Sequence, residues 1–290
     1  MSMKGKEGEC SMDIRLQRKN LLYISMLLFV LILLIPLCGF AGSYEGFEFQ
    51  LDSTTRKITI YDYTGTDTSV TIPASIQGYY VTEIGYFTFG YSAVQTVRFE
   101  SGSKVDTIGE SAFSGCKSLV SIELPDTVRT IKNSAFFNCT SLRSIVIPSG
   151  VTELRPDTFD GCTSLSQVSL PSTLQAIGGF SFRNCSSLKT ITLPKGLTEL
   201  GSHSFNNSGL TQITIPAGVT QIGQRCFEDC ANLEKVVLSN NVDWIGTGTF
   251  SNCTSLVSIN IPEDLSLIEE CAFSGCTSLR KLRFGEKTWP

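Results

Sequence analysis

A fixed period of 23 residues constrains this sequence more than any other feature. Phenylalanine and proline recur with the same period as cysteine, and one unit is a residue short. The cysteine position is occupied by Cys116, Cys139, Cys162, Cys185, Ser208, Cys230, Cys253 and Cys276. Self-similarity at a fixed period is the signature of a repeat protein, and about eight units fit this template.

The first half of each unit has the pattern of a short strand. Ile191 and Leu193 alternate with Thr190 and Thr192, and β-branched residues are common at the equivalent positions. Proline follows, as at Pro194, and it lacks the N–H that would extend the hydrogen-bond ladder. The second half predicts an extended pair of residues that leads into a tight helical turn.

The residue before each repeat cysteine, or before Ser208, is always glycine, asparagine or aspartate. These types tolerate a positive φ angle. The positions are Gly115, Asn138, Gly161, Asn184, Asn207, Asp229, Asn252 and Gly275. The sequence therefore predicts a left-handed turn at the same place in every coil of a solenoid.

A single unit cannot fold alone. Ordering each residue costs roughly 1 to 2 kcal/mol, whereas burying one large apolar side chain returns only about 1.5 to 3 kcal/mol. Stacked coils cover one another's apolar flanks, so stability becomes a sum of unit and neighbour contributions. We expect a mostly β solenoid of short parallel strands, with a continuous stack of phenylalanines inside it.

Four recurring elements carry a family resemblance. They are Cys-Thr-Ser-Leu at 162–165, Ile-x-Ile-Pro at 145–148, Ile-Gly at 177–178 and Ser-Phe-x-x-Cys at 181–185. Together they resemble the BspA-like leucine-rich repeat surface proteins. The resemblance implies a leucine-rich repeat solenoid over residues 81–290, preceded by an N-terminal cap at 42–80.

The same resemblance implies a function. Such proteins lie on microbial surfaces, so this chain is expected to adhere to host matrix proteins, host cells or other microbes. Its partners would be extracellular proteins or glycans. The alternative is a structural extracellular scaffold or spacer without a dedicated ligand.

The N-terminus has the features of an export signal. Basic residues precede an apolar run at 21–37, and Gly39 and Ala41 fit a signal peptidase site. We expect residues 1–41 to be a signal peptide cleaved after Ala41. The run of 17 residues also reaches the lower limit for spanning a bilayer, so an uncleaved membrane anchor is the alternative. Either way the protein is expected to be secreted or on the cell surface, and the anchor would be its only membrane contact.

The charge balance argues against nucleic acid as a partner. The chain carries 23 basic and 27 acidic residues, a net charge of −4. Removing residues 1–41 leaves 18 basic and 24 acidic residues, a net charge of −6. Such a chain has no basic excess to neutralise a phosphate backbone.

Nine cysteines follow residue 41, and their spacing favours buried free thiols. Equivalent positions in adjacent coils lie about 4.7 to 4.9 Å apart with parallel side chains. A disulfide needs Cβ atoms about 3.5 to 4.5 Å apart and angled together. Disulfides or a metal ladder remain the alternatives.

The sequence offers no catalytic constellation. His203 is the only histidine, and its counterparts vary as a solvated position does: Ser111, Ser134, Asp157, Phe180, Arg225, Gly248 and Cys271. Nucleophilic catalysis needs a second, oriented group, and no distinctive partner is present. Phosphate-binding loops and zinc spacings are also missing, so we expect a protein that is not an enzyme, with no catalytic residue, cofactor or metal.

The candidate ligand surface is the outward row of the predicted strands. Polar, uncharged residues occupy its middle: Gln167, Ser169, Thr190, Thr192, Gln212 and Thr214. In a leucine-rich repeat protein this row would form an extended concave face. The alternative interpretation is that serine and threonine are merely suited to exposed strands.

Overall fold

The computed structural model describes residues 40–280, 282–284 and 287–288. Residues 1–39 of the expected signal peptide or anchor, including the apolar run at 21–37, lie outside the described residues. From Phe40 onward the chain forms one compact unit. Its first strand, β1 (Phe40–Tyr44), begins at Phe40, so the cleavage site expected after Ala41 falls within this strand.

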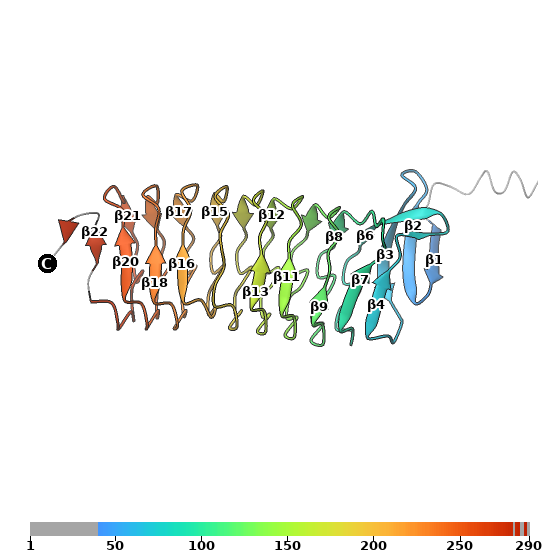
Figure 1. Ribbon diagram of the computed structural model, residues 1–290, viewed down its shortest axis with the longest axis horizontal. Helices are drawn as coiled ribbons and strands as arrows, with labels where there is room; N and C mark the ends of the chain where they lie inside the picture. The colour runs from blue at the N-terminus through green and yellow to red at the C-terminus, as the bar shows by residue number, and fades with distance from the viewer. Residues whose placement is uncertain (1–39, 281, 285–286, 289–290) are drawn as a thin grey trace, which may run out of the picture. The chain divides into compact units, whose positions relative to one another are not determined.

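Every coil except the one that contains residues 190–193 contributes one strand to a front row, visible as the longer arrows in Figure 1. The front row consists of two parallel sheets. The first contains β4 (Ser69–Ile72), β7 (Thr96–Phe99), β9 (Ser121–Ile122), β11 (Ser144–Val146) and β13 (Gln167–Ser169). The second contains β16 (Gln212–Thr214), β18 (Lys235–Val237), β20 (Ser258–Ile261) and β22 (Arg283–Phe284), and β23 (Lys287–Thr288) pairs antiparallel with β22.

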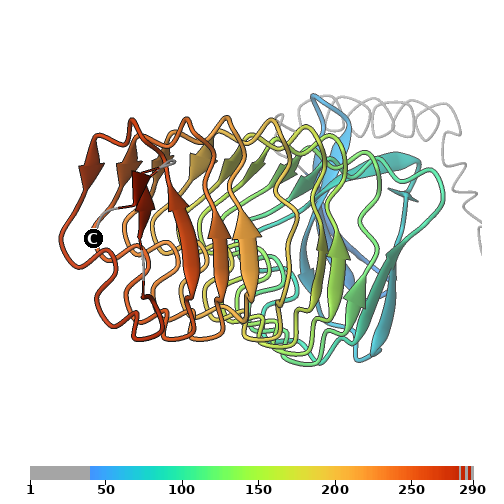
Figure 2. The same ribbon diagram turned by 60° about the vertical axis from the view of Figure 1, so that its left-hand side comes forward.

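A back row of short strands lies on another side of the same coils (Figure 2). It begins with β6 (Tyr79–Ile84), β8 (Thr107–Ile108) and β10 (Thr130–Ile131). A second sheet continues it with β12 (Glu153–Leu154), β14 (Ala176–Ile177), β15 (Glu199–Leu200), β17 (Gln221–Ile222), β19 (Trp244–Ile245) and β21 (Leu267–Ile268). Each coil therefore crosses both rows, as the 23-residue period predicted.

The segment expected as a cap has a different topology. Strands β1, β2 (Phe47–Asp52) and β3 (Lys57–Tyr63) are antiparallel, and β5 (Ser75–Ile76) pairs antiparallel with β6. Strand β3 then pairs parallel with β6, so the antiparallel strands pass directly into the back row.

The turns differ from the tight helical turns expected from the sequence, because the described residues contain no helix. Within a turn, Cys116 N–H donates to Phe113 O at 3.1 Å, as in a tight turn. Phe113 N–H, however, donates to Ala135 O of the next coil at 2.8 Å. Hydrogen bonds thus alternate between the same coil and its neighbour, which prevents a continuous helical ladder.

The predicted left-handed turns are confirmed. Every residue that precedes the cysteine position has a positive φ angle, between 52° at Asn207 and 75° at Gly161. A second row of positive φ angles was not predicted. It contains Phe87 and the positions interpreted as variable and solvated, namely Ser111, Ser134, Asp157, Phe180, His203, Arg225, Gly248 and Cys271.

The core is a stack of phenylalanine rings flanked by leucine, isoleucine and valine. Neighbouring rings from Phe89 to Phe273 have centroids 4.9 to 5.5 Å apart and are within 15° of parallel. All of them except Phe273 are almost completely buried. Since each ring belongs to a different coil, the stack connects every coil to the next.

Cysteines form a second buried ladder beside the phenylalanines. Cys139 Sγ donates to Phe113 O at 3.1 Å, and Cys162 Sγ donates to Phe136 O at the same distance. Burial raises the pKa of Cys116 and Cys230 to about 11. In the structure all nine cysteines of the described residues are free, and only Cys271 is exposed. The ladder thiols act as hydrogen-bonded packing groups.

Candidate binding surface

The six candidate residues all lie exposed on the front row. Gln167 and Ser169 are on β13, and Gln212 and Thr214 are on β16. Thr190 and Thr192 belong to the coil between these strands. The alternation inferred from the sequence is therefore present, with Ile213 buried between the two outward residues of β16.

Strand pairing aligns this row with its neighbours. Gln167 pairs with Ser144, and Gln212 pairs with Lys235. The face therefore extends from β11 to β13 on one side of the 190–193 segment and from β16 to β18 on the other. An exposed valine, Val146, also lies on it, with 67% of its surface accessible. The front face is thus a mixed polar and apolar surface rather than a purely polar one.

The front row is interrupted at residues 190–193. This segment is not a strand, and it separates the sheet that ends at β13 from the sheet that begins at β16. Within the described residues, no backbone N–H or C=O group of residues 190–193 takes part in a backbone hydrogen bond. Native proteins pair the great majority of such groups with protein or water. The segment therefore offers donors and acceptors that the fold does not use.

The interruption lies beside the one short repeat. Ser208-Gly209-Leu210 has one residue fewer than Cys185-Ser186-Ser187-Leu188. A Cβ atom at Gly209 would lie 2.1 Å from Ser186 O, so only glycine permits this close approach of the two coils. Thr211 N–H still donates to Lys189 O at 3.0 Å, but the ladder does not continue beyond that bond.

A hollow of about 720 Å³ lies over this interruption. Four of the six candidate residues line it, namely Thr190, Thr192, Gln212 and Thr214. Gln167 and Ser169 are outside it. Its volume is in the range of about 300 to 1,000 Å³ that is typical of ligand sites.

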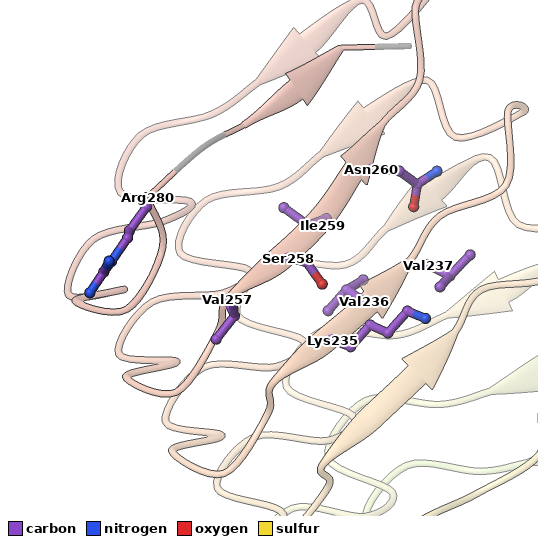
Figure 3. Close-up of a pocket in the computed structure, with 8 residues that line it drawn as sticks. All are labelled: Lys235, Val236, Val237, Val257, Ser258, Ile259, Asn260 and Arg280. Carbon is purple, nitrogen blue, oxygen red and sulfur yellow. The ribbon is translucent and has the colours of Figure 1, made fainter. Parts of the chain in front are cut away.

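A second hollow, of about 610 Å³, lies farther along the same face (Figure 3). Its lining comes from β18, β20 and the turn at Arg280, and Val257 on its edge is 61% exposed. Strand alternation predicts that Lys235, Ser258 and Asn260 face outward, but it does not single out Val257 or Arg280. The available signal was Val257 itself, an apolar residue at a position that is polar in most other repeats, such as Lys189.

The side chain of Asn260, which lines the second hollow, is held by two hydrogen bonds to the neighbouring coil. Its side-chain Oδ1 accepts from Leu238 N–H at 2.8 Å, and its Nδ2 donates to Leu238 O at 2.9 Å. The amide thus satisfies both backbone groups at the end of β18. Such bidentate pairing fixes the side chain against the neighbouring coil.

Charge is distributed unevenly along the front face. Near the N-terminal end, Arg98 Nε lies 3.8 Å from Glu123 Oε1, and both side chains are mostly exposed. Around the second hollow, Lys235 and Arg280 have no ion-pair partner among the described residues. The outward residues of the row are thus uncharged over the 190–193 segment, where Lys195 is the one charged residue that lines the hollow, and the face is cationic beyond it.

His203 lies away from the front face, in the second row of positive φ angles. Its ring stacks on that of Phe180 with centroids 4.6 Å apart, and the guanidinium of Arg183 also lies over the Phe180 ring, 4.4 Å from its centroid. Burial lowers the pKa of His203, and its Nδ1 is buried without a hydrogen-bond partner. This histidine packs in a stack and has no nucleophile bonded to it.

The described residues contain no group of three or more histidine, cysteine, aspartate or glutamate side chains placed to hold a metal ion. Over the same residues, no helix is long and apolar enough to cross a membrane.

Comparison with known families decides the classification. The family described as BspA type leucine rich repeat region matches residues 35–166 and 157–280, in six copies. The chain belongs to the BspA-type leucine-rich repeat family. No curated protein matches the sequence.

Two solved structures are similar to this chain. A leucine rich cell surface protein from Faecalibacterium prausnitzii is 22% identical, with a TM-score of 0.50, over 86% of this chain and 95% of that one. The T. pallidum leucine-rich repeat protein is 26% identical, with a TM-score of 0.48, over 82% of this chain and 90% of that one. The first of these similarities supports the solenoid fold of the BspA-type chain.

Proposed function

We propose that this BspA-type protein is a surface or secreted binding protein that adheres to extracellular proteins through its front face. The interrupted sheet at 190–193 carries the proposal, because it places unpaired backbone groups beside Thr190, Thr192, Gln212 and Thr214 under one hollow. A polypeptide partner presents amide groups that match these donors and acceptors. The surface location is also supported by the cell-surface description of the F. prausnitzii protein.

A binding role fits the chemistry of the described residues better than a catalytic one. The buried thiols of the cysteine ladder are held protonated, as the raised pKa of Cys230, about 11, illustrates. A nucleophilic cysteine needs the opposite shift. His203 is stacked on Phe180, and its buried Nδ1 has no hydrogen-bond partner among the described residues that could act as an oriented acid or nucleophile.

The neutral middle of the face sets the expected character of binding. Gln167, Thr190 and Gln212 carry no charge, so the affinity should change little with ionic strength. Many modest contacts should contribute, and each single alanine substitution is expected to weaken binding only slightly. The combined change Gln167→Ala, Thr190→Ala and Gln212→Ala should weaken it far more.

A matched control lies on the back row. Thr152, Gln175 and Gln221 are also exposed, and their side chains make no hydrogen bonds within the described residues. Both triple variants are compared by binding to immobilised matrix proteins and to partner cells. If the front-row variant folds and still binds as well as the back-row variant, the front face is not the binding surface. If the wild-type protein binds neither the matrix proteins nor the partner cells, the alternative of a structural spacer without a ligand is favoured.

A further inference from the structure

A third hollow lies at the N-terminal end of the back row, away from the front face. It has a volume of about 470 Å³ and is built by three successive segments of chain. Lys57 begins β3 and pairs in register with Tyr80 of β6. Asp106 N–H donates to Thr82 O at 2.9 Å, which holds the loop that carries Lys104 beside β6.

Three cations line this hollow in a chain whose net charge is negative. Lys57 Nζ lies 3.9 Å from Asp106 Oδ2, so one positive charge is partly neutralised. Arg56 and Lys104 have no carboxylate within ion-pairing distance among the described residues. The hollow therefore has an excess of two positive charges, and an anionic ligand would complete it.

Arg56 is held in place before any ligand arrives. Its backbone N–H donates to the backbone oxygen of Asp52 at 2.7 Å, and its guanidinium lies over the ring of Tyr79, 5.3 Å from the ring centroid. The carboxylate of Asp52 does not compete for it, because Asp52 Oδ1 accepts from Thr54 N–H and Thr55 N–H at 2.8 and 3.1 Å. A guanidinium stacked on an aromatic ring keeps its N–H edge available to a carboxylate or sulfate.

Tyr80 supplies a second kind of contact. Its side chain is 55% exposed and lies on the lining of the hollow, next to Lys57 in the strand register. An exposed tyrosine offers an apolar ring face and a hydroxyl, which suits a flat ligand that is apolar on one side and polar at its rim. A sugar ring has this character.

We propose that this hollow binds an acidic saccharide, with its carboxylate or sulfate on Arg56 and Lys104 and its ring against Tyr80. The volume is sufficient for a small ligand or for one part of a longer chain. The site is separate from the front face and does not depend on the adhesion proposed above. Its affinity should fall as salt rises, in contrast to the affinity expected at the uncharged residues in the middle of the front face.

The test uses the full chain and defined oligosaccharides in calorimetric titrations. A hyaluronan tetrasaccharide supplies carboxylates, a chondroitin sulfate tetrasaccharide adds sulfate, and chitotetraose is the neutral comparison. Both acidic probes should bind and chitotetraose should not. Whichever acidic probe binds more tightly identifies the preferred anionic group.

Variants separate the contributions of charge and ring. Arg56→Gln with Lys104→Gln should raise the Kd for the acidic probes by about tenfold or more. The control, Lys117→Gln with Arg143→Gln, removes the same charges from exposed side chains elsewhere and should leave the Kd unchanged. Tyr80→Thr should weaken saccharide binding severalfold while leaving the binding of free sodium sulfate unaltered.

Three results would overturn the proposal. They are equal binding of chitotetraose, an unchanged Kd in the Arg56 and Lys104 variant, and saccharide binding that is insensitive to Tyr80→Thr. The last result would mean that the hollow attracts anions of any kind and does not recognise a sugar. Loss of front-face adhesion in the earlier triple variant has no bearing on these titrations, so the two proposals fail separately.

Discussion

The phenylalanine stack is tested most directly at Phe182. This ring is completely buried and lies between Phe159 at 5.5 Å and Phe205 at 5.2 Å. Burial of such a side chain is worth about 1.5 to 3 kcal/mol, and each of the two aromatic pairs adds about 0.5 to 1.5 kcal/mol. Phe182→Ala should therefore lower the free energy of unfolding by about 3 to 5 kcal/mol, the range seen when buried phenylalanines become alanine.

The end of the stack supplies the comparison. Phe273 is partly buried, and Phe250 at 5.4 Å is its only ring neighbour among the described residues. Phe273→Ala should therefore cost less than Phe182→Ala. Phe89 near the cap is not a suitable comparison, because it is 1% exposed and stacks on both Tyr63 and Phe113.

Urea titration followed by circular dichroism measures the effect. The unfolding midpoint of the Phe182 variant should move to a lower urea concentration. The slope of the free energy of unfolding against urea concentration should stay the same, which indicates lost stability rather than a changed unfolded state. The reasoning would be refuted by a Phe182→Ala protein within about 0.5 kcal/mol of wild type, a difference expected of surface substitutions.

Three further predictions concern the turns and the thiols. Asn184 has a φ angle of 61° and joins Asp160 to Asn207 through its side-chain amide; Asn184→Ala should therefore destabilise by about 2 kcal/mol and Asn184→Gly by less, and equal urea midpoints would contradict the strained turn. Thiol counting on the denatured, unreduced protein should find most of the nine cysteines free, whereas the native protein should react first at exposed Cys271; resistance to alkylation after denaturation would instead indicate disulfides. Burial raises the pKa of Cys226 to about 12 and that of Cys230 to about 11, so the stability due to the protonated thiols is present at neutral pH and is lost as pH rises through about 9 to 12. Cys226→Ala should make urea midpoints fall less steeply above about pH 9, and an unchanged slope would remove this explanation.

Much of the architecture follows from local regularities in the sequence. The period of Phe159, Phe182 and Phe205 determines which side chains face inward, because an apolar residue at a fixed place in each coil is covered only by its counterparts. The turn before each cysteine is equally predictable, since Asn184 and Gly161 belong to types that tolerate positive φ. The outward direction of Gln167 and Gln212 follows from strand alternation.

The second row of positive φ angles could not be predicted in this way. Phe180 and Arg225 are not residues that favour a left-handed conformation, and the variability of this position suggested only exposure. Hydrogen bonds between coils impose the conformation, as when His203 N–H donates to Gln224 O at 2.9 Å. The same contacts between coils explain why the expected helical turns are absent from the described residues.

The sequence by itself determined the solenoid, its core and the row of side chains exposed on its front face, because these depend on a pattern repeated within each coil. The tertiary structure decided where that face is interrupted and where the surface is hollowed. The break at 190–193 arises between a full repeat and a short one, and the cationic hollow combines Arg56, Lys57 and Lys104 from segments up to 48 positions apart. Such features depend on how adjacent coils fit together, and the spacing of residues within one coil does not encode that fit.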